Sequence, residues 1–236
     1  MTALEQQEPR GADPAAVMAF LRQALGRVRP PAAMQWLDDA IARAQGQRDE
    51  RRLDIALGMV GRKVGRTDLA PSTDDVAAAG KLRPRWQPQN WGTDEAARVV
   101  LLLATYRGDD KDFATRVDRL CATGELTEHV AYLKGFAVFP AAKDLHDRAR
   151  EAVRSSITAV FEAIACRNPY PQDYFDDDAW NQMVVKCVFS GLPIEGITGL
   201  RERRNPELVT MLGDLVSERH AAGRAVPDEV LRYIAT

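Results

Sequence analysis

The sequence predicts an all-α protein. Apolar residues recur at three- and four-residue spacing in nearly every segment between Pro14 and Ala235, and no stretch alternates with period two for long enough to form a strand. About a dozen short helices are expected, either in an orthogonal helical bundle or in a curved stack of helix pairs like HEAT repeats. No sequence repeat of fixed period is present, so the HEAT-like stack is predicted from helix lengths alone.

The first three helices follow from capping residues and one-sided apolar stripes. Asp13 and Pro14 form an N-cap with proline at the first helical position, and Gly26 is expected to close this helix. Pro31 opens the second helix, and a third is expected from about 51 to 63.

A short helix and a loop come next. Ser72, with Asp75 three residues later, predicts a capping box for a helix that ends near Ala79. The segment KLRPRWQPQNWG at 81–92 has no periodicity and contains two tryptophans, prolines and a glycine. It is expected to be a surface loop.

The middle of the chain contains the most apolar helix. Thr93 is expected to cap it, and the run VVLLL at 99–103 predicts a central position in the core. Helices are then expected at 109–122 and 125–137, followed by one long helix at 143–165.

Prolines and glycines mark the predicted helix ends in the C-terminal part. A helix or irregular turn is expected at about 194–203. Asn205 and Pro206 start a helix that ends at Gly223, and Pro227 opens a terminal helix.

Composition and charge are those of an ordinary folded protein. The 236 residues are 45% hydrophobic and 28% charged, with a formal net charge of −2, so no strong field draws the chain to nucleic acid or to an anionic membrane. We expect a flexible N-terminal tail at 1–12 and a single helical domain at 13–236.

The cysteines and the apolar runs indicate a cytoplasmic protein without a membrane span. Cys121, Cys166 and Cys187 are widely spaced in apolar helical contexts, as is typical of reduced thiols that pack in a core. The N-terminus lacks the features of a secretory signal, and uncharged runs are far shorter than a bilayer requires.

The stretch CRNPYPQDYFDDDAWNQMVVKCVF at 166–189 combines two prolines, two tyrosines and three consecutive acids with an apolar helix. The prolines must interrupt the preceding helix near Arg167, which makes a stiff loop. Asp176, Asp177 and Asp178 fall at the cap and first turn of the next helix, where carboxylates satisfy free amides and oppose the helix dipole.

Polar side chains on this apolar helix are candidates for a site. Asn181, Gln182 and Lys186 must be hydrogen-bonded, paired or facing a cleft, and we expect them to share a recess. For Lys186, a snorkelling side chain or an ion pair with Asp177 or Asp178 is the alternative. Tyr170 and Tyr174 either pack their rings and bond their hydroxyls to the backbone or contact a ligand.

Familiar catalytic and metal-binding patterns are not found. The three histidines lack metal-ligand spacing, the DYFDDD run lacks the glycine of a calcium loop, and no nucleophile motif is present. Neither a cofactor nor a metal is expected. Basic residues cluster at Arg83 and Arg85, near Trp86 and Trp91, and again at 201–204; they fit a nucleic-acid surface or, alternatively, a solvated loop and a helix end.

A connected set of motifs near the C-terminus resembles a known family. The motifs are Arg167-Asn168-Pro169-Tyr170-Pro171, Tyr174-Phe175, Ala179-Trp180-Asn181-Gln182, Lys186 and Asn205-Pro206-Glu207-Leu208. They resemble the EboA-like family of bacterial metabolite-traffic proteins, most strongly over 160–235. The resemblance implies a soluble cytoplasmic accessory protein, encoded with membrane and hydrolase-like partners, that helps to move precursors of secondary metabolites. It brings no catalytic residues.

The sequence is therefore compatible with three hypotheses about function. The preferred hypothesis is a non-enzymatic accessory or scaffold protein that binds a small metabolite or a protein of the same gene cluster, with contact to a membrane protein also open and nucleic acid not expected. Its expected site residues are Arg167, Asn168, Tyr170, Tyr174, Asp177, Asn181, Gln182 and Lys186. The alternatives are an enzyme or enzyme subunit that uses Lys186 and a nearby carboxylate for proton transfer, and a HEAT-like nucleic-acid binder.

Overall fold

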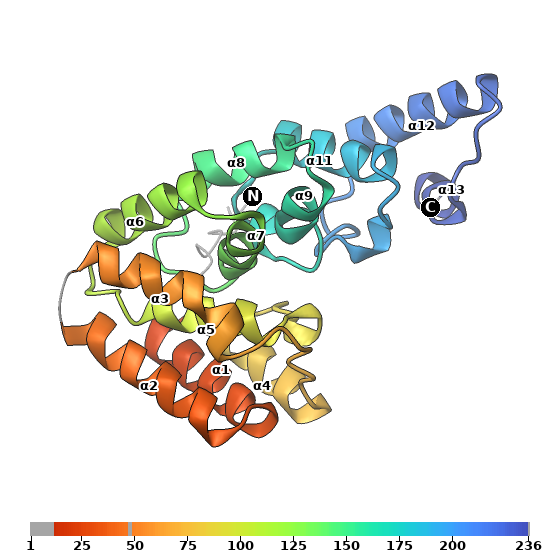
Figure 1. Ribbon diagram of the computed structural model, residues 1–236. Coiled ribbons are helices and arrows are strands. Elements are labelled where there is room, and N and C mark those ends of the chain that lie inside the picture. The colour runs from red at the N-terminus through yellow and green to blue at the C-terminus, as the bar shows by residue number, and fades with distance from the viewer. Residues whose placement is uncertain (1–11, 47–48, 236) are drawn as a thin grey trace, which may run out of the picture.

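The computed structural model describes residues 12–46 and 49–235, and the all-α class is confirmed (Figure 1). The α-helices are α1 (Pro14–Val28), α2 (Pro31–Gly46), α3 (Glu50–Lys63), α4 (Thr73–Leu82), α5 (Thr93–Leu103), α6 (Asp110–Thr123), α7 (Leu126–Gly135), α8 (His146–Arg154), α9 (Thr158–Ala165), α10 (Tyr170–Tyr174), α11 (Asp177–Phe189), α12 (Pro206–Ala221) and α13 (Asp228–Ala235). Two 3-10 turns, η1 (Pro88–Asn90) and η2 (Ile194–Gly196), join them. The predicted tail at 1–12 lies outside the described residues except for Ala12.

Helix α5 is the centre of the N-terminal half. Nearly all of its residues are buried, and it packs against α1, α2, α3 and α7. Its predicted central position is confirmed because its valines and leucines face neighbours on every side. The prediction that Thr93 caps it was wrong: Gly92 is the N-cap, and the Thr93 hydroxyl donates instead to the Gly65 carbonyl at 2.9 Å.

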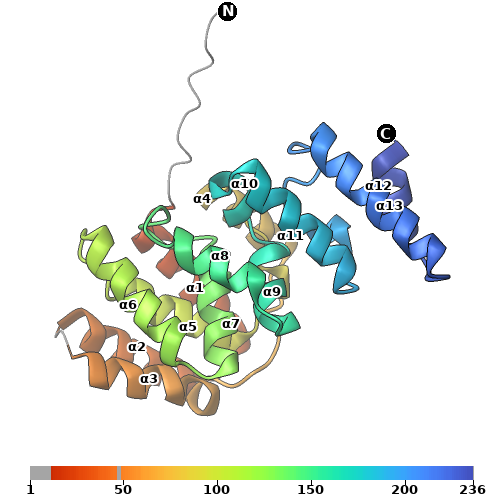
Figure 2. The ribbon, with the colours of Figure 1, turned by 90° about the horizontal axis from the view of Figure 1, so that it is seen from above.

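From α5 the packing continues through α7, α9, α11 and α12 to α13, each helix contacting the next. The N-terminal and C-terminal helices therefore lie at opposite ends of the molecule (Figure 2). One contiguous hydrophobic cluster runs from Ala12 to Tyr233, and the three cysteines are free and buried. The HEAT-like stack and the single domain stay predictions.

The segment at 81–92 is not the predicted surface loop. Trp86 and Trp91 are each 2% exposed and meet edge to face, with ring centroids 5.5 Å apart. Phe20 of α1 makes a second edge contact to Trp86 at 5.4 Å. Burying two indoles removes much apolar area from water, which outweighs the turn-like composition of the segment.

The single helix predicted at 143–165 is two helices, α8 and α9. The chain turns at Ser155, whose hydroxyl accepts from the Ile157 amide at 3.1 Å. Lys186 of α11 donates to the carbonyls of Val153 and Ser155, which satisfies two backbone acceptors where α8 ends. Helix α1 is longer than predicted, because it continues past Gly26 to Val28.

Candidate functional site

The stretch at 166–189 contains α11 and, before it, a tight junction that connects α9 to α11. Arg167 has a φ of +53°, and its amide donates to the Gly196 carbonyl at 2.7 Å. The predicted break near Arg167 is confirmed. The loop also contains the short helix α10, which was not predicted because prolines usually interrupt helices. Pro171 is tolerated here because it lies in the first turn.

Two of the predicted site residues hold this junction together from inside. The Asn168 amide donates to the carbonyls of Leu133 and Ala163, both at 3.1 Å, and its side-chain oxygen accepts from the Tyr170 amide. The Tyr170 hydroxyl donates to the Ala142 carbonyl at 2.6 Å. Both residues are buried, so their polar groups serve the fold.

Ring packing accounts for the aromatic content of the junction. Tyr170 contacts Phe136 and Phe175 at their edges, and its ring centroid lies 4.8 Å from that of Tyr174. Burial raises the pKa of Tyr170 well above its usual value. Half-buried Tyr174 remains at the edge of this cluster.

The three consecutive acids have three different partners. Asp176 caps α11 by accepting from the Ala179 amide at 2.8 Å, which lowers the pKa of that carboxyl. Asp177 pairs with Arg203 at 2.5 Å, and Asp178 accepts from Gln182 at 2.9 Å. The predicted cap and first-turn positions of these carboxylates are confirmed.

Asn181 does not share a recess with Gln182 and Lys186. It is buried, and it exchanges two side-chain hydrogen bonds with Asn205, which caps α12. This part of the prediction was wrong because the two amides satisfy each other across α11 and α12. Gln182 is exposed and lies on the other side of α11.

Lys186 has neither of the predicted carboxylate partners. Its ammonium donates to the carbonyls of Val153 and Ser155, both at 2.7 Å, and lies 4.9 Å from the Phe161 ring centroid. Desolvation by burial lowers its pKa. The ammonium thus neutralises the negative end of α8 rather than a side chain.

A hollow of about 300 Å³ lies between α8 and α11. We call it the α8–α11 hollow; it is lined by Arg150, Val153, Arg154, Ala179, Gln182, Met183 and Lys186. None of these described lining residues is acidic, although Arg150 is paired with Asp176 at 3.1 Å. Two predicted site residues, Gln182 and Lys186, therefore do share a recess, and its character is cationic.

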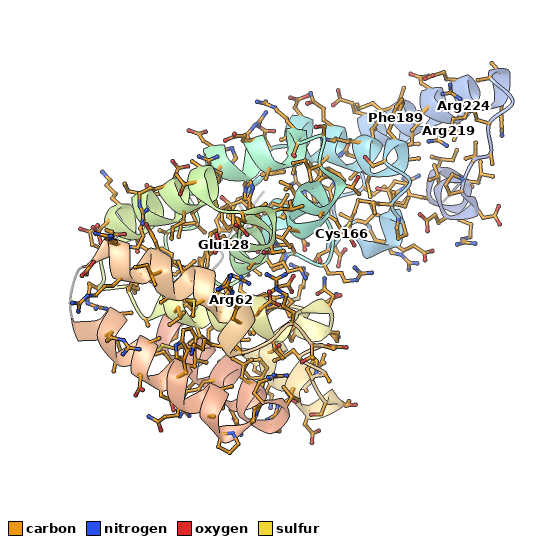
Figure 3. The ribbon with its side chains drawn as sticks, viewed as in Figure 1. Arg62, Glu128, Cys166, Phe189, Arg219 and Arg224 are labelled. Atoms are coloured by element: carbon orange, nitrogen blue, oxygen red, sulfur yellow. The ribbon has the colours of Figure 1, made fainter. Side chains whose placement is uncertain are left out.

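Two apolar side chains that lie close in the chain to residues around this hollow are exposed. Ile157 follows Ser155 by two residues and is 50% exposed, and Phe189 follows Lys186 by one helical turn and is 63% exposed. Phe189 lies at the end of α11 near Arg219 of α12 (Figure 3), and Arg219 donates to the neighbouring Val188 carbonyl.

Each of the two basic clusters contains an arginine that is bonded within the fold. Arg83 is buried and donates to the Ala137 carbonyl and to Asp173. Arg203 lies over the Trp180 ring, with its Cζ atom 4.8 Å from the centroid, and donates to the Phe175 carbonyl at 2.7 Å. Arg83 and Arg203 therefore have structural partners, whereas Arg85 and Arg201 are exposed, and the nucleic-acid alternative stays a prediction.

A larger cavity, of about 390 Å³, lies in the N-terminal half and was missed by sequence reasoning. We call it the α2–α3–α5 cavity; its described lining is Ala40, Ala42, Arg43, Ala44, Gly46, Asp49, Glu50, Arg52, Leu53, Ala56, Leu101, Thr105, Arg107 and Arg116. Alanines dominate the α2 wall, and small side chains between two packed helices are the only signal that the sequence offers for it.

Neither a metal centre nor a membrane span is found in the part of the chain that the structure describes. No group of three or more His, Cys, Asp or Glu side chains gathers there at metal-binding distance, and none of its helices is both long and apolar enough to cross a bilayer.

Comparison with known proteins identifies a family. A family described as metabolite traffic protein EboA matches residues 17–235, which includes the N-terminal half, where the motif resemblance is weak. No curated protein and no solved structure matches the chain. Because the match covers nearly the whole chain, this protein belongs to the metabolite traffic protein EboA family.

Proposed function

We propose that this protein is a non-enzymatic accessory protein of secondary-metabolite traffic that docks a pathway protein at the α8–α11 hollow. The observation that carries the proposal is the pairing of a cationic recess with two exposed apolar side chains, Ile157 and Phe189, at its edges. The partner it fits has acidic residues around an apolar contact. Interfaces combine an apolar centre with a polar rim in this way.

Rigidity of the recess supports docking. Lys186 is fixed by two carbonyls, and Arg150 is held by Asp176, so the cations would lose little conformational freedom when a partner binds. The family description, metabolite traffic protein, is consistent with either a protein partner or a metabolite.

The surroundings of Lys186 favour a role without catalysis. A general acid–base pair needs the lysine and a carboxylate within hydrogen-bond reach of the same reacting group. The ammonium of Lys186 is directed to backbone carbonyls, while Asp177 and Asp178 bond Arg203 and Gln182. The proton-transfer alternative therefore has no acid partner for Lys186 among these residues.

The predicted site residues divide between support and contact. Asn168, Tyr170 and Asn181 are buried and would support the surface without touching a partner. Gln182 and Lys186 line the hollow and would touch it. The remaining three, Arg167, Tyr174 and Asp177, stay candidate partner contacts at the margin of the same region.

The experiment replaces the native copy in the producing host with Ile157→Asp or Arg154→Glu, and it measures exported pathway product together with the amount of this protein. Both side chains are exposed, so the fold should survive. We expect product export to fall several-fold while protein level stays constant, because a charge enters the apolar rim or reverses in the recess.

The matched control is Ile55→Asp. Ile55 is 58% exposed on α3, far from the hollow, and receives the same change of side chain. Export that stays at the wild-type level in the Ile157 and Arg154 variants, or that falls equally in the Ile55 control, would contradict the proposal.

A further inference from the structure

The α2–α3–α5 cavity has the size and position of a small-molecule site. Its volume of about 390 Å³ falls within the range of known ligand pockets. Helices α2 and α3 supply most of its described lining, to which Leu101 of α5 and Thr105, two residues beyond α5, also belong.

Most of the cavity wall is apolar. Ala40, Ala44, Leu53, Ala56 and Leu101 present only hydrocarbon to the space between the helices. Each Ala in the wall leaves room that a larger side chain would fill, and close-packed interiors do not usually leave such room. A hydrocarbon segment of a ligand would gain about 25 cal/mol for each Å² that it buries here.

The charges around the cavity are unbalanced. The described lining includes four arginines (Arg43, Arg52, Arg107 and Arg116) and two acids, Asp49 and Glu50. Both acids are already committed, since Asp49 pairs with Arg52 at 3.0 Å and Glu50 pairs with Arg116 at 2.9 Å. A net positive potential remains at the cavity.

Two of the arginines supply that excess charge. Arg107 donates to the carbonyls of Ala44 and Gln45 at the end of α2, at 2.8 and 2.7 Å, which fixes its guanidinium without neutralising it. Arg43, which directly precedes Ala44 on α2, is exposed. Neither forms an ion pair with a carboxylate among the described residues.

Arg116 is held in the cavity wall by two carboxylates. It is only 7% exposed, its Nε donates to Glu50 and its Nη2 to Asp112, yet its Nη1 is buried without any hydrogen-bond partner. An unsatisfied buried donor costs about 1–3 kcal/mol, and more when it is charged.

We propose that the α2–α3–α5 cavity binds a small amphipathic molecule with an apolar body and a single carboxylate or phosphate group. The apolar body packs against the alanines and leucines, and the anionic oxygens are held by the arginines. This site is separate from the α8–α11 hollow, so the protein carries a ligand in one half and docks a partner with the other. The inference does not depend on the docking proposal.

Isothermal titration calorimetry on the full chain tests the ligand class. The probes are decanoate, decyl phosphate, decan-1-ol and decylammonium, each below its micellar concentration. Decanoate or decyl phosphate should bind at least about tenfold more tightly than decan-1-ol, and decylammonium should bind least, because the arginines attract only the anions. The better anion identifies the headgroup. Equal binding of anion and alcohol, or no binding by either anion, overturns the inference.

Two pairs of variants place the ligand. Ala56→Leu fills the cavity and should abolish binding, whereas Ala78→Leu, at a half-buried alanine of α4 outside the cavity, should not. Arg43→Gln should weaken decanoate several-fold and leave decan-1-ol unchanged, whereas Arg62→Gln on α3 (Figure 3) should change neither.

Arg43 and Arg62 are both exposed, so their substitutions should not disturb the fold. They therefore test the ligand site even if Ala56→Leu fails to fold. Unchanged decanoate binding in Arg43→Gln, or in a folded Ala56→Leu variant, places the ligand elsewhere and overturns the inference. Loss of ligand binding with intact product export, or the reverse, separates this site from the docking surface.

Discussion

Asn181 of α11 and Asn205 at the start of α12 exchange hydrogen bonds through both of their side-chain amides. Asn181 donates to the Asn205 oxygen at 3.2 Å and accepts from the Asn205 amide at 2.9 Å. The same Asn205 oxygen also accepts from the Leu208 amide, which caps α12. One pair of side chains therefore joins two helices and starts the second of them.

The first prediction concerns this pair. Asn181→Ala should lower the free energy of unfolding by about 1–3 kcal/mol, because two part-buried hydrogen bonds to Asn205, each contributing about 0.5–1.5 kcal/mol, are lost. Asn205→Ala should cost more, since the α12 cap is lost as well. Urea unfolding measures both, and the exposed neighbour Gln182→Ala is the control, with a change within about 0.5 kcal/mol.

A double-mutant cycle sharpens that test. If the two amides are coupled, the Asn181→Ala and Asn205→Ala double variant should lose less than the sum of the single variants, by about 0.5–3 kcal/mol. Strict additivity would show that the observed pairing contributes nothing to stability.

The second prediction concerns Lys186. Lys186→Met should destabilise the protein by about 1–3 kcal/mol, because the carbonyls of Val153 and Ser155 lose their donor at the end of α8. Thermal unfolding at pH 7 measures this loss, with Lys81→Met on α4 as an exposed lysine control.

The same lysine gives a pH dependence. Its pKa is lowered in the folded protein by desolvation, so the unfolded state binds more protons in the pH window just below the normal lysine value of 10.5. Stability conferred by Lys186 should therefore rise with pH in that window. The difference in unfolding free energy between wild type and Lys186→Met should grow between pH 8 and about 10.5; a difference that shrinks would contradict the direction of the shift.

The third prediction concerns the contribution of the buried Arg83–Asp173 pair to stability. Arg83→Met should cost about 3–5 kcal/mol, since Asp173 would remain as a nearly buried charge without its partner. Adding Asp173→Asn should recover part of the loss. Arg85→Gln, at an exposed arginine two residues away, should leave stability within about 0.5 kcal/mol. A stable Arg83→Met protein would argue against the buried pair.

The fourth prediction uses two helical glycines in opposite surroundings. A Cβ atom on Gly135 of α7 would overlap the Phe139 ring, so Gly135→Ala should destabilise by about 1–3 kcal/mol or more. A Cβ on Gly213 of α12 meets nothing within 4 Å, so Gly213→Ala should stabilise by about 0.5–1 kcal/mol through helix propensity. Thermal unfolding of both variants measures the two signs.

Local rules account for the parts of the fold that could be predicted. Asp13, Asp176 and Asn205 act as N-caps, and Ser72 forms its capping box with Asp75, because every one of these contacts closes within three residues along the chain. The all-α class follows from the same short-range periodicity. Residue spacing alone is enough to determine such contacts.

The candidate sites required the tertiary structure, because their contacts join distant parts of the chain. Asn181 bonds a residue 24 positions away, Lys186 a carbonyl 33 away and Arg83 a carboxylate 90 away. The sequence determined that these polar side chains needed partners. Which groups would satisfy them, and which cations would be left facing a hollow or a cavity, depended on helix packing, since the burial that drives it is non-directional and carries no signal in residue spacing.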